Sequence, residues 1–154
     1  MRSRIQAVVL PSEIGEFADE VRRIFREIGP SVSPDTFAGE CVPPVDVYET
    51  DEALEIAIDL PGVDATGVRV VIKGGALLVA GEKTPRRGRG DSSFHLVERG
   101  FGRFARLIRL TAACDAGRAG AVLRNGELRI TVPKLPERRG VAIQVPVTTG
   151  QSVA

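Results

Sequence analysis

The stretch AVLRNGELRITVPK, residues 121–134, decides the fold class of this chain. Asn125-Gly126 predicts a tight type I′ turn, because both residues tolerate the positive φ angles of that turn. After the turn, apolar residues alternate with polar ones, which is the period-2 pattern of a strand with one buried face. These apolar residues are Leu128, Ile130 and Val132. Pro133 lacks the N–H group that would continue the ladder. The stretch therefore predicts a β-hairpin with one apolar side and one side facing solvent.

The same period recurs upstream of the hairpin. Short apolar alternations follow one another about every ten residues at 45–48, 54–60, 68–72 and 76–81, and no helical pattern lies between them. Another such run covers residues 103–110. Pro61-Gly62 and Gly74-Gly75 supply turn signals between successive runs. Strands at this spacing favour an antiparallel β-sandwich over a fold with alternating strands and helices. We therefore expect an all-β domain.

One amphipathic helix is predicted ahead of the strands, at about residues 12–28. Ser12 suits the N-cap, and Gly29-Pro30 ends the helical pattern. Apolar residues recur at spacings of three and four and form a single stripe: Ile14, Phe17, Ala18, Val21, Ile24, Phe25 and Ile28. The stripe can pack on the chain's own core or on a partner, and the sequence leaves both open. Residues 30–42 have no period and are interpreted as a linker.

Two further segments lack a partner in the local pattern. Residues 84–93, TPRRGRGDSS, predict a long exposed loop, followed by a short strand around Phe94, Leu96 and Val97. After a charged spacer, apolar residues alternate again at Val141, Ile143, Val145 and Val147. A strand without a hairpin neighbour must dock elsewhere, on this chain or on another.

Arg106 lies on the same face of its predicted strand as the apolar Phe104 and Ile108. A positive charge on a core-facing row is costly unless a carboxylate, a carbonyl group or an interface compensates it. Arg106 is therefore expected to have such a partner.

Composition limits the classes of function. The chain has 154 residues, enough for one domain with arms, and 43% of them are hydrophobic, which indicates a globular protein. A net charge of +1 gives no general attraction to nucleic acid or to anionic membranes. Cys41 and Cys114 lie far apart in the sequence and are interpreted as free thiols. The apolar run near the N-terminus is too short to span a bilayer and short for a signal peptide, so we expect a cytoplasmic protein.

None of the residue patterns in the sequence indicates a catalytic or cofactor-binding site. Ser92, Ser93 and His95 lie beside Asp91, but near neighbours on an extended loop cannot easily converge as a triad. His95 is the only histidine, which excludes a multi-histidine metal site. Residues 100–105 match a dinucleotide-binding string, yet a strand pattern follows where a helix is required. We therefore expect no enzyme activity and no cofactor.

In order along the chain, the motifs resemble those of the small heat-shock proteins, the Hsp20 or α-crystallin family, in its bacterial form. The hairpin at 121–134 is similar to the family's signature hairpin. FHLVERGFGRFARLIRL, residues 94–110, is similar to a second family segment, and Ile143-Gln144-Val145 to the tail motif. Asp59-Leu60-Pro61-Gly62 also matches a family turn. Thr111 stands where the family usually has proline, and Glu127 where an apolar residue is common.

The resemblance implies an immunoglobulin-like sandwich, here residues 43–137, with an N-terminal arm at 1–42 and a tail at 138–154. It implies an ATP-independent chaperone that holds partly unfolded proteins and assembles from dimers into larger homo-oligomers. An adaptor or co-chaperone sandwich that binds one defined partner is the alternative, although such modules generally lack the tail motif and the dimerising loop.

The resemblance also assigns roles to residues of this chain. Ile143 and Val145 would dock in an edge groove of a neighbouring subunit, formed by Val68, Val70, Ile72, Ala121 and Leu123. The dimer loop would carry Phe94, His95, Leu96 and Val97, with Arg106 at an interface. The arm residues that would bind clients are Ile14, Phe17, Val21, Ile24 and Phe25.

Overall fold

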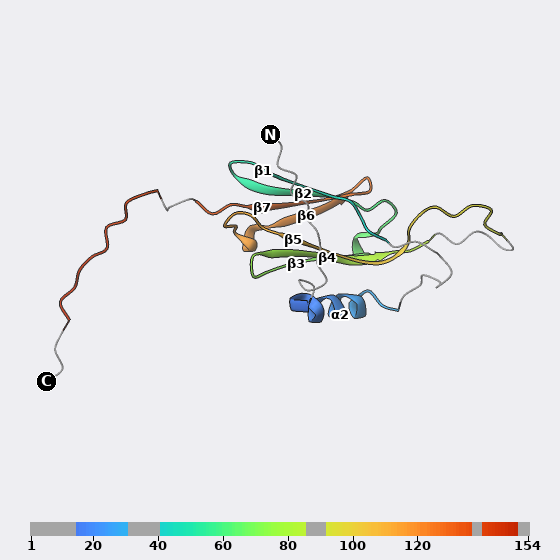
Figure 1. Cartoon of the computed structure of the whole chain (residues 1–154), viewed down its shortest axis with the longest axis horizontal. Helices are drawn as coiled ribbons and strands as arrows, with labels where there is room; N and C mark the ends of the chain where they lie inside the picture. The colour runs from blue at the N-terminus through green and yellow to red at the C-terminus, as the bar shows by residue number, and fades with distance from the viewer. Residues whose placement is uncertain (1–14, 31–40, 86–91, 137–139, 151–154) are drawn as a thin grey trace.

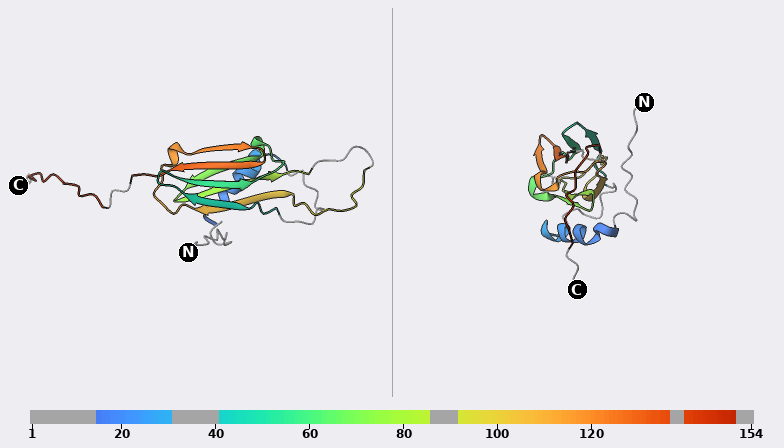
Figure 2. Two further views of the ribbon diagram at one scale, coloured as in Figure 1. Left: turned by 90° about the horizontal axis from the view of Figure 1, so that it is seen from above. Right: turned by 90° about the vertical axis from the view of Figure 1, so that its left-hand side faces the viewer.

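The computed structural model describes residues 15–30, 41–85, 92–136 and 140–150, and these form two antiparallel sheets packed face to face (Figures 1 and 2). One sheet has the order β1-β2-β7-β6 and the other has the order β3-β4-β5. The strands are β1 (Val45–Glu49), β2 (Ala53–Asp59), β3 (Val68–Lys73), β4 (Ala76–Lys83), β5 (Gly102–Arg109), β6 (Gly120–Arg124) and β7 (Glu127–Pro133). Short 3-10 turns, η2 (Ala65–Gly67) and η3 (Ala116–Arg118), precede β3 and β6. The predicted antiparallel sandwich is confirmed.

The hairpin between β6 and β7 has the predicted turn. Asn125 and Gly126 both have positive φ angles, of 52° and 76°, as a type I′ turn requires. Arg124 pairs with Glu127 on either side of the turn. The Gly126 carbonyl accepts a hydrogen bond of 2.7 Å from the Leu60 N–H, which ties this turn to the end of β2.

The main core lies between the two sheets. Each strand contributes alternate residues to it, so the period-2 pattern of the sequence becomes a layer of buried side chains. The buried members are Leu54, Ile56, Ile58, Leu60, Val68, Leu77, Val79, Phe104, Ile108, Leu128, Ile130 and Val132.

Gly81 fits into this core only because it has no side chain. It pairs with Val68 on β3 and with Phe104 on β5. A Cβ atom placed there would lie 2.3 Å from the Gly67 carbonyl oxygen and 2.9 Å from Cζ of Phe104. The ring of Phe104 and the backbone of η2 thus occupy the space above this residue.

A second, smaller core lies on the outer face of the β3-β4-β5 sheet. A 3-10 turn, η1 (Gly15–Phe17), leads into the helix α2 (Ala18–Glu27), which packs across this face (Figure 1). Phe17 and Ile24 are buried there, and Val21 and Phe25 are partly buried. The helix lies within the predicted range of about 12–28, but α2 begins only at Ala18 with Phe17 as its N-cap, and its stripe packs on its own chain. Ser12 and Ile14 lie outside the described residues.

Two elements differ from the sequence-based expectation. Residues 92–101 form no strand, so the short strand predicted around Phe94 is absent from this single chain. Residues 141–150 likewise form no strand and extend away from the sandwich (Figure 1). Both segments lack a neighbouring strand edge to pair with, which is what an extended segment needs to form a ladder.

Candidate interaction site

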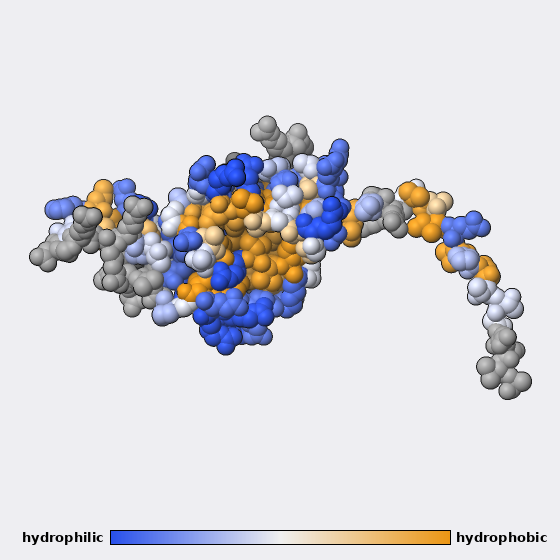
Figure 3. Space-filling view, turned by 180° about the vertical axis from the view of Figure 1, so that it is seen from behind, coloured by the Kyte–Doolittle hydropathy of each residue, from blue (hydrophilic) through white to orange (hydrophobic). Residues whose placement is uncertain are grey.

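A groove lies at one open side of the sandwich, between the edge strands β3 and β6. It has a volume of about 300 Å³ and is lined by Val70, Ile72, Ala116, Ala119, Gly120, Ala121 and Ile130. Figure 3 shows an apolar patch in the middle of the face opposite to that seen in Figure 1, where this edge lies. An edge strand presents unpaired N–H and C=O groups. The groove therefore offers both apolar contacts and hydrogen-bonding groups to an extended segment.

The structure brings together three of the five residues predicted to form the groove, namely Val70, Ile72 and Ala121. Val68 is instead buried in the main core, and Leu123 packs against that core from the edge. Ala116 of η3 also lines the groove and was not among the predicted residues. The Asp115 carboxylate accepts a hydrogen bond from the Gly117 N–H and starts this turn. An Asp-x-Gly sequence before a strand is the signal that could have indicated the turn.

The predicted tail motif is exposed. Ile143 and Val145 retain 65% and 76% of their accessible surface, and their neighbours Val141 and Val147 are exposed as well. Four apolar side chains in alternation on an extended, solvent-exposed segment suit contact with another surface. Within the described chain, this tail does not occupy the groove.

The loop between β4 and β5 carries a second exposed apolar group. Phe94, Leu96 and Val97 are exposed, as is His95. The base of this loop is organised by Phe101, whose ring lies 5.6 Å from Nζ of Lys83 and 5.0 Å from the Arg99 guanidinium carbon. The loop and the tail leave the sandwich at opposite ends (Figure 1).

Arg106 has the carbonyl partner that its position on a core-facing row requires. Its Nη1 donates a hydrogen bond of 2.8 Å to the carbonyl oxygen of Pro43, in the segment that leads into β1. The arginine therefore connects β5 to the start of the opposite sheet. A role at an interface between subunits stays a prediction.

The two cysteines are half-buried free thiols. Burial raises the pKa of both Cys41 and Cys114 above the usual 9.0. Among the described residues, no group of three or more His, Cys, Asp or Glu side chains could hold a metal ion. Nor does this part of the chain contain a helix long and apolar enough to cross a membrane.

An apolar edge groove and exposed apolar segments on a β-sandwich are suited to contact with other polypeptide segments. The model of the Hsp20/alpha crystallin family matches residues 46–148. The chain therefore belongs to this family, the small heat-shock proteins, whose members are chaperones and not enzymes.

Individual relatives agree with this assignment. The chain is 38% identical over 104 residues to spore protein SP21 of Stigmatella aurantiaca, and the matched region covers 68% of this chain and 62% of that protein. It is 32% identical over 133 residues to the 16.9 kDa class I heat shock protein 3 of Oryza sativa subsp. japonica, covering 83% and 89%. Among solved structures, heat shock protein 16.0 from Schizosaccharomyces pombe superposes with a TM-score of 0.61 at 32% identity, covering 71% of this chain and 100% of that one.

Proposed function

We propose that this chain is an ATP-independent holdase, which binds partly unfolded proteins and prevents their aggregation. The observation that carries the proposal is that one chain has both an exposed apolar tail motif and an apolar edge groove, which the tail of the same chain does not occupy. A tail cannot be left in solvent and a groove left empty without cost, since each exposes apolar surface. Pairing them between subunits gives a reversible assembly that can release binding surfaces under stress.

In this proposal, Ile143 and Val145 of one subunit dock against Val70, Ile72 and Ala121 of another. Burial of each tail side chain contributes roughly 1.5–3 kcal/mol, less the cost of ordering the tail. One such contact is weak, but repetition around an oligomer makes the assembly firm. Phe94, Leu96 and Val97 would add a second contact by joining a free sheet edge of a dimer partner.

Client binding would begin when contacts open. Phe17 and Ile24 are buried in the closed chain, so they reach a client only after α2 leaves the sheet. Partly unfolded proteins expose apolar surface and strand edges, which match what the opened subunit offers. We further propose that the arm ends near residue 42, that the tail begins near residue 138, and that the protein works in the cytoplasm.

The test is light scattering of a heat-labile client, warmed with and without the protein in the absence of ATP. We expect suppression near one subunit per client. A protein that stays folded but fails to suppress at several-fold excess would refute the holdase proposal, and would favour an adaptor that binds one defined partner.

The assembly contact is tested with a double variant, Ile143→Ala with Val145→Ala. We expect its mass, measured by multi-angle light scattering, to fall towards that of a dimer. Gln144→Ala with Thr148→Ala is the matched control, because these side chains alternate with the apolar ones on the same tail. An unchanged mass for the first variant would refute docking through the tail.

A further inference from the structure

The outer faces of the two sheets differ in character. On the β1-β2-β7-β6 sheet the outer face carries polar pairs: the hydroxyl of Thr131 donates a hydrogen bond of 2.8 Å to the Glu55 carboxylate, and Arg129 pairs with Glu127. On the β3-β4-β5 sheet the outer face carries an apolar strip, which consists of Val71, Ala76, Leu78, Ala80, Ala105 and Leu107. Such a strip needs a cover, since exposing it to water is unfavourable.

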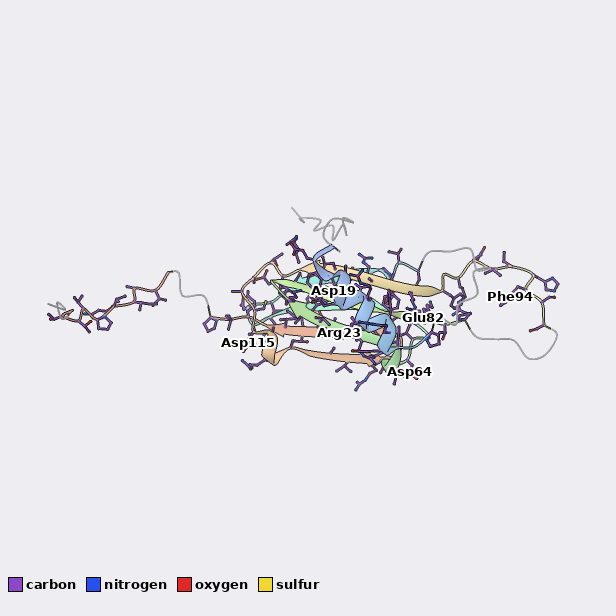
Figure 4. The ribbon with its side chains drawn as sticks, turned by 90° about the horizontal axis from the view of Figure 1, so that it is seen from below. Asp19, Arg23, Asp64, Glu82, Phe94 and Asp115 are labelled. Carbon is purple, nitrogen blue, oxygen red and sulfur yellow. The ribbon has the colours of Figure 1, made fainter. Side chains whose placement is uncertain are left out.

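The helix α2 provides that cover in this chain, as the view in Figure 4 shows. Phe17, Val21, Ile24 and Phe25 follow the spacing of one helical face and lie against the strip. The helix itself is short, with ten residues, and no side chain caps its N-terminus. Isolated helices of this length are marginal in water, so α2 depends on the sheet for its stability.

Charged residues along β3 align with acids on α2. The Lys73 ammonium lies 2.9 Å from Oε1 of Glu20, and Nε of Arg69 lies 3.5 Å from Oε2 of Glu27. Glu20 is well covered, with 14% of its side-chain surface exposed. The hydrogen bond from Lys73 is the main cause that lowers the pKa of this glutamate. The strip therefore has a basic flank that meets the acidic flank of a helix.

Arg103 on β5 recognises the C-terminal end of the helix. Its Nη2 donates a hydrogen bond of 2.6 Å to the carbonyl oxygen of Gly29, and its guanidinium lies 4.8 Å from the centroid of the Phe25 ring. Beneath it, the nearly buried Glu82 carboxylate lies 3.9 Å from Nε of Arg103. A cation at this end also complements the helix dipole. The sheet thus contacts three features of the helix: its apolar stripe, its acidic flank and the carbonyl group of Gly29 just after its C-cap.

We propose that the outer face of the β3-β4-β5 sheet is a binding surface for amphipathic helices with an acidic flank, and that α2 occupies it as an internal mimic. This inference deepens the proposed holdase function, on which it rests, by naming a client chemistry and the surface that takes it. The complementarity of Lys73 and Arg69 with acids selects this class of occupant. Because α2 is tethered, it competes at high effective concentration, and only its release opens the surface.

The experiment measures binding of a fluorescent peptide with the sequence of residues 15–30, GEFADEVRRIFREIGP, to the full-length protein by anisotropy. Ile24→Asp in the protein places a charge in the apolar contact and frees the strip. We expect the peptide to bind this variant at least about tenfold more tightly than the wild type, because the tethered competitor is gone. Val122→Asp is the control, since Val122 is 59% exposed on another edge, and it should bind like the wild type.

Two additions make the test specific. A peptide with lysine at the positions of Glu20 and Glu27 should bind several-fold more weakly, since it repels the basic flank. Val21→Asp in the protein also places a charge in the apolar contact and loosens α2, and it leaves the sheet residues of the surface, Arg103 included, unchanged. Hydrogen exchange of the β4 amides verifies that the sheet of each variant is folded.

Equal peptide binding by the wild type and both loosened variants would overturn the proposal, as would equal binding of the charge-reversed peptide. If the assembly formed by the Ile24→Asp variant grew in mass but did not bind the peptide, the strip would be a contact for a second copy of this chain. That result would also overturn the proposal. Client suppression is measured in parallel. Peptide binding without suppression would refute only the holdase, whereas suppression without peptide binding would refute only this surface.

Discussion

Gly81→Ala provides a sharp test of the sandwich described above. The added methyl group would lie 2.3 Å from the backbone carbonyl of Gly67, and 2.9 Å from the ring of Phe104. The ring can turn aside, but the carbonyl belongs to the chain that enters β3 and cannot move without shifting the Val68–Gly81 pair. The substitution must therefore separate β3 from β4 or move Phe104 out of the core.

Overpacking of this kind usually lowers the free energy of unfolding by about 1–3 kcal/mol. The clash here involves backbone, so we expect the upper part of that range. For a folded unit of roughly 100 residues, this upper part of the range corresponds to a melting temperature lower by about 10–15 °C.

The assay is thermal unfolding followed by circular dichroism, at one fixed protein concentration because assembly also affects the midpoint. Gly15→Ala is the control: a Cβ there meets nothing within 4 Å, its φ angle is not in the left-handed region, and the residue lies outside the groove. We expect the control to change the free energy of unfolding by less than about 0.5 kcal/mol. If the melting temperature of Gly81→Ala lay within about 2 °C of the wild type, a change of less than about 0.5 kcal/mol, the described contact of Gly81 with Gly67 would be wrong.

Three further predictions concern the hairpin turn, the helix and the thiols. Gly126→Ala should destabilise the fold by about 1–2 kcal/mol in urea unfolding, because its φ angle is +76° and a Cβ would lie 3.1 Å from Cα of Pro61; an unchanged midpoint would contradict this. The pKa of Glu20 is lowered in the folded chain, so its contribution to docking of α2 is present at neutral pH and is lost as the pH falls below 4.5. The protection of α2 amides against hydrogen exchange, relative to the intrinsic rate at each pH, should therefore fall on acidification more than the protection of the strand amides does. An equal fall in α2 and in the strands would refute the role of Glu20 in docking. Burial raises the pKa values of Cys41 and Cys114, so both thiols should react slowly with iodoacetamide at pH 8 and faster in urea. Fast labelling of the native protein, measured by mass spectrometry, would contradict this prediction.

The strands could be predicted because their information is local. Period-2 alternation and paired turn residues such as Asn125-Gly126 and Gly74-Gly75 specify strands and tight turns without reference to the rest of the chain. The strands β2 and β7 lie more than sixty residues apart, and their pairing cannot be inferred from the sequence of either strand alone. The resemblance to a family implied a sandwich, and only the structure gives this pairing.

The second core was harder to foresee, although a signal was present. Residues 76–80, ALLVA, form a continuous apolar run, which is typical of a strand buried on both faces. All five are buried: Leu77 and Val79 face the other sheet, whereas Ala76, Leu78 and Ala80 face α2. Where the helix stripe packs depends on three-dimensional placement, so the sequence left its own sheet and a partner equally open.

The contacts of the loop and the tail depend on a second chain, which no property of one sequence specifies. Alternation at Ile143 and Val145 indicates that a partner is needed, but not which edge receives it. Arg106 is similar: its row required a partner of some kind, and only the fold identifies the Pro43 carbonyl.

The departure of the loop and the tail from opposite ends of the sandwich has a consequence for growth. In the proposed assembly, two subunits joined through their loops carry one free tail each, and such a dimer is, in the language of polymer chemistry, a bifunctional monomer. Such dimers would add to one another through their tails without an intrinsic stopping point, and growth would end only when the assembly closes into a ring or cage. The size of the particle would then be fixed by the angle at which successive links meet. Changes in the few residues that join the tail to β7 would therefore alter subunit number while leaving every contact surface intact.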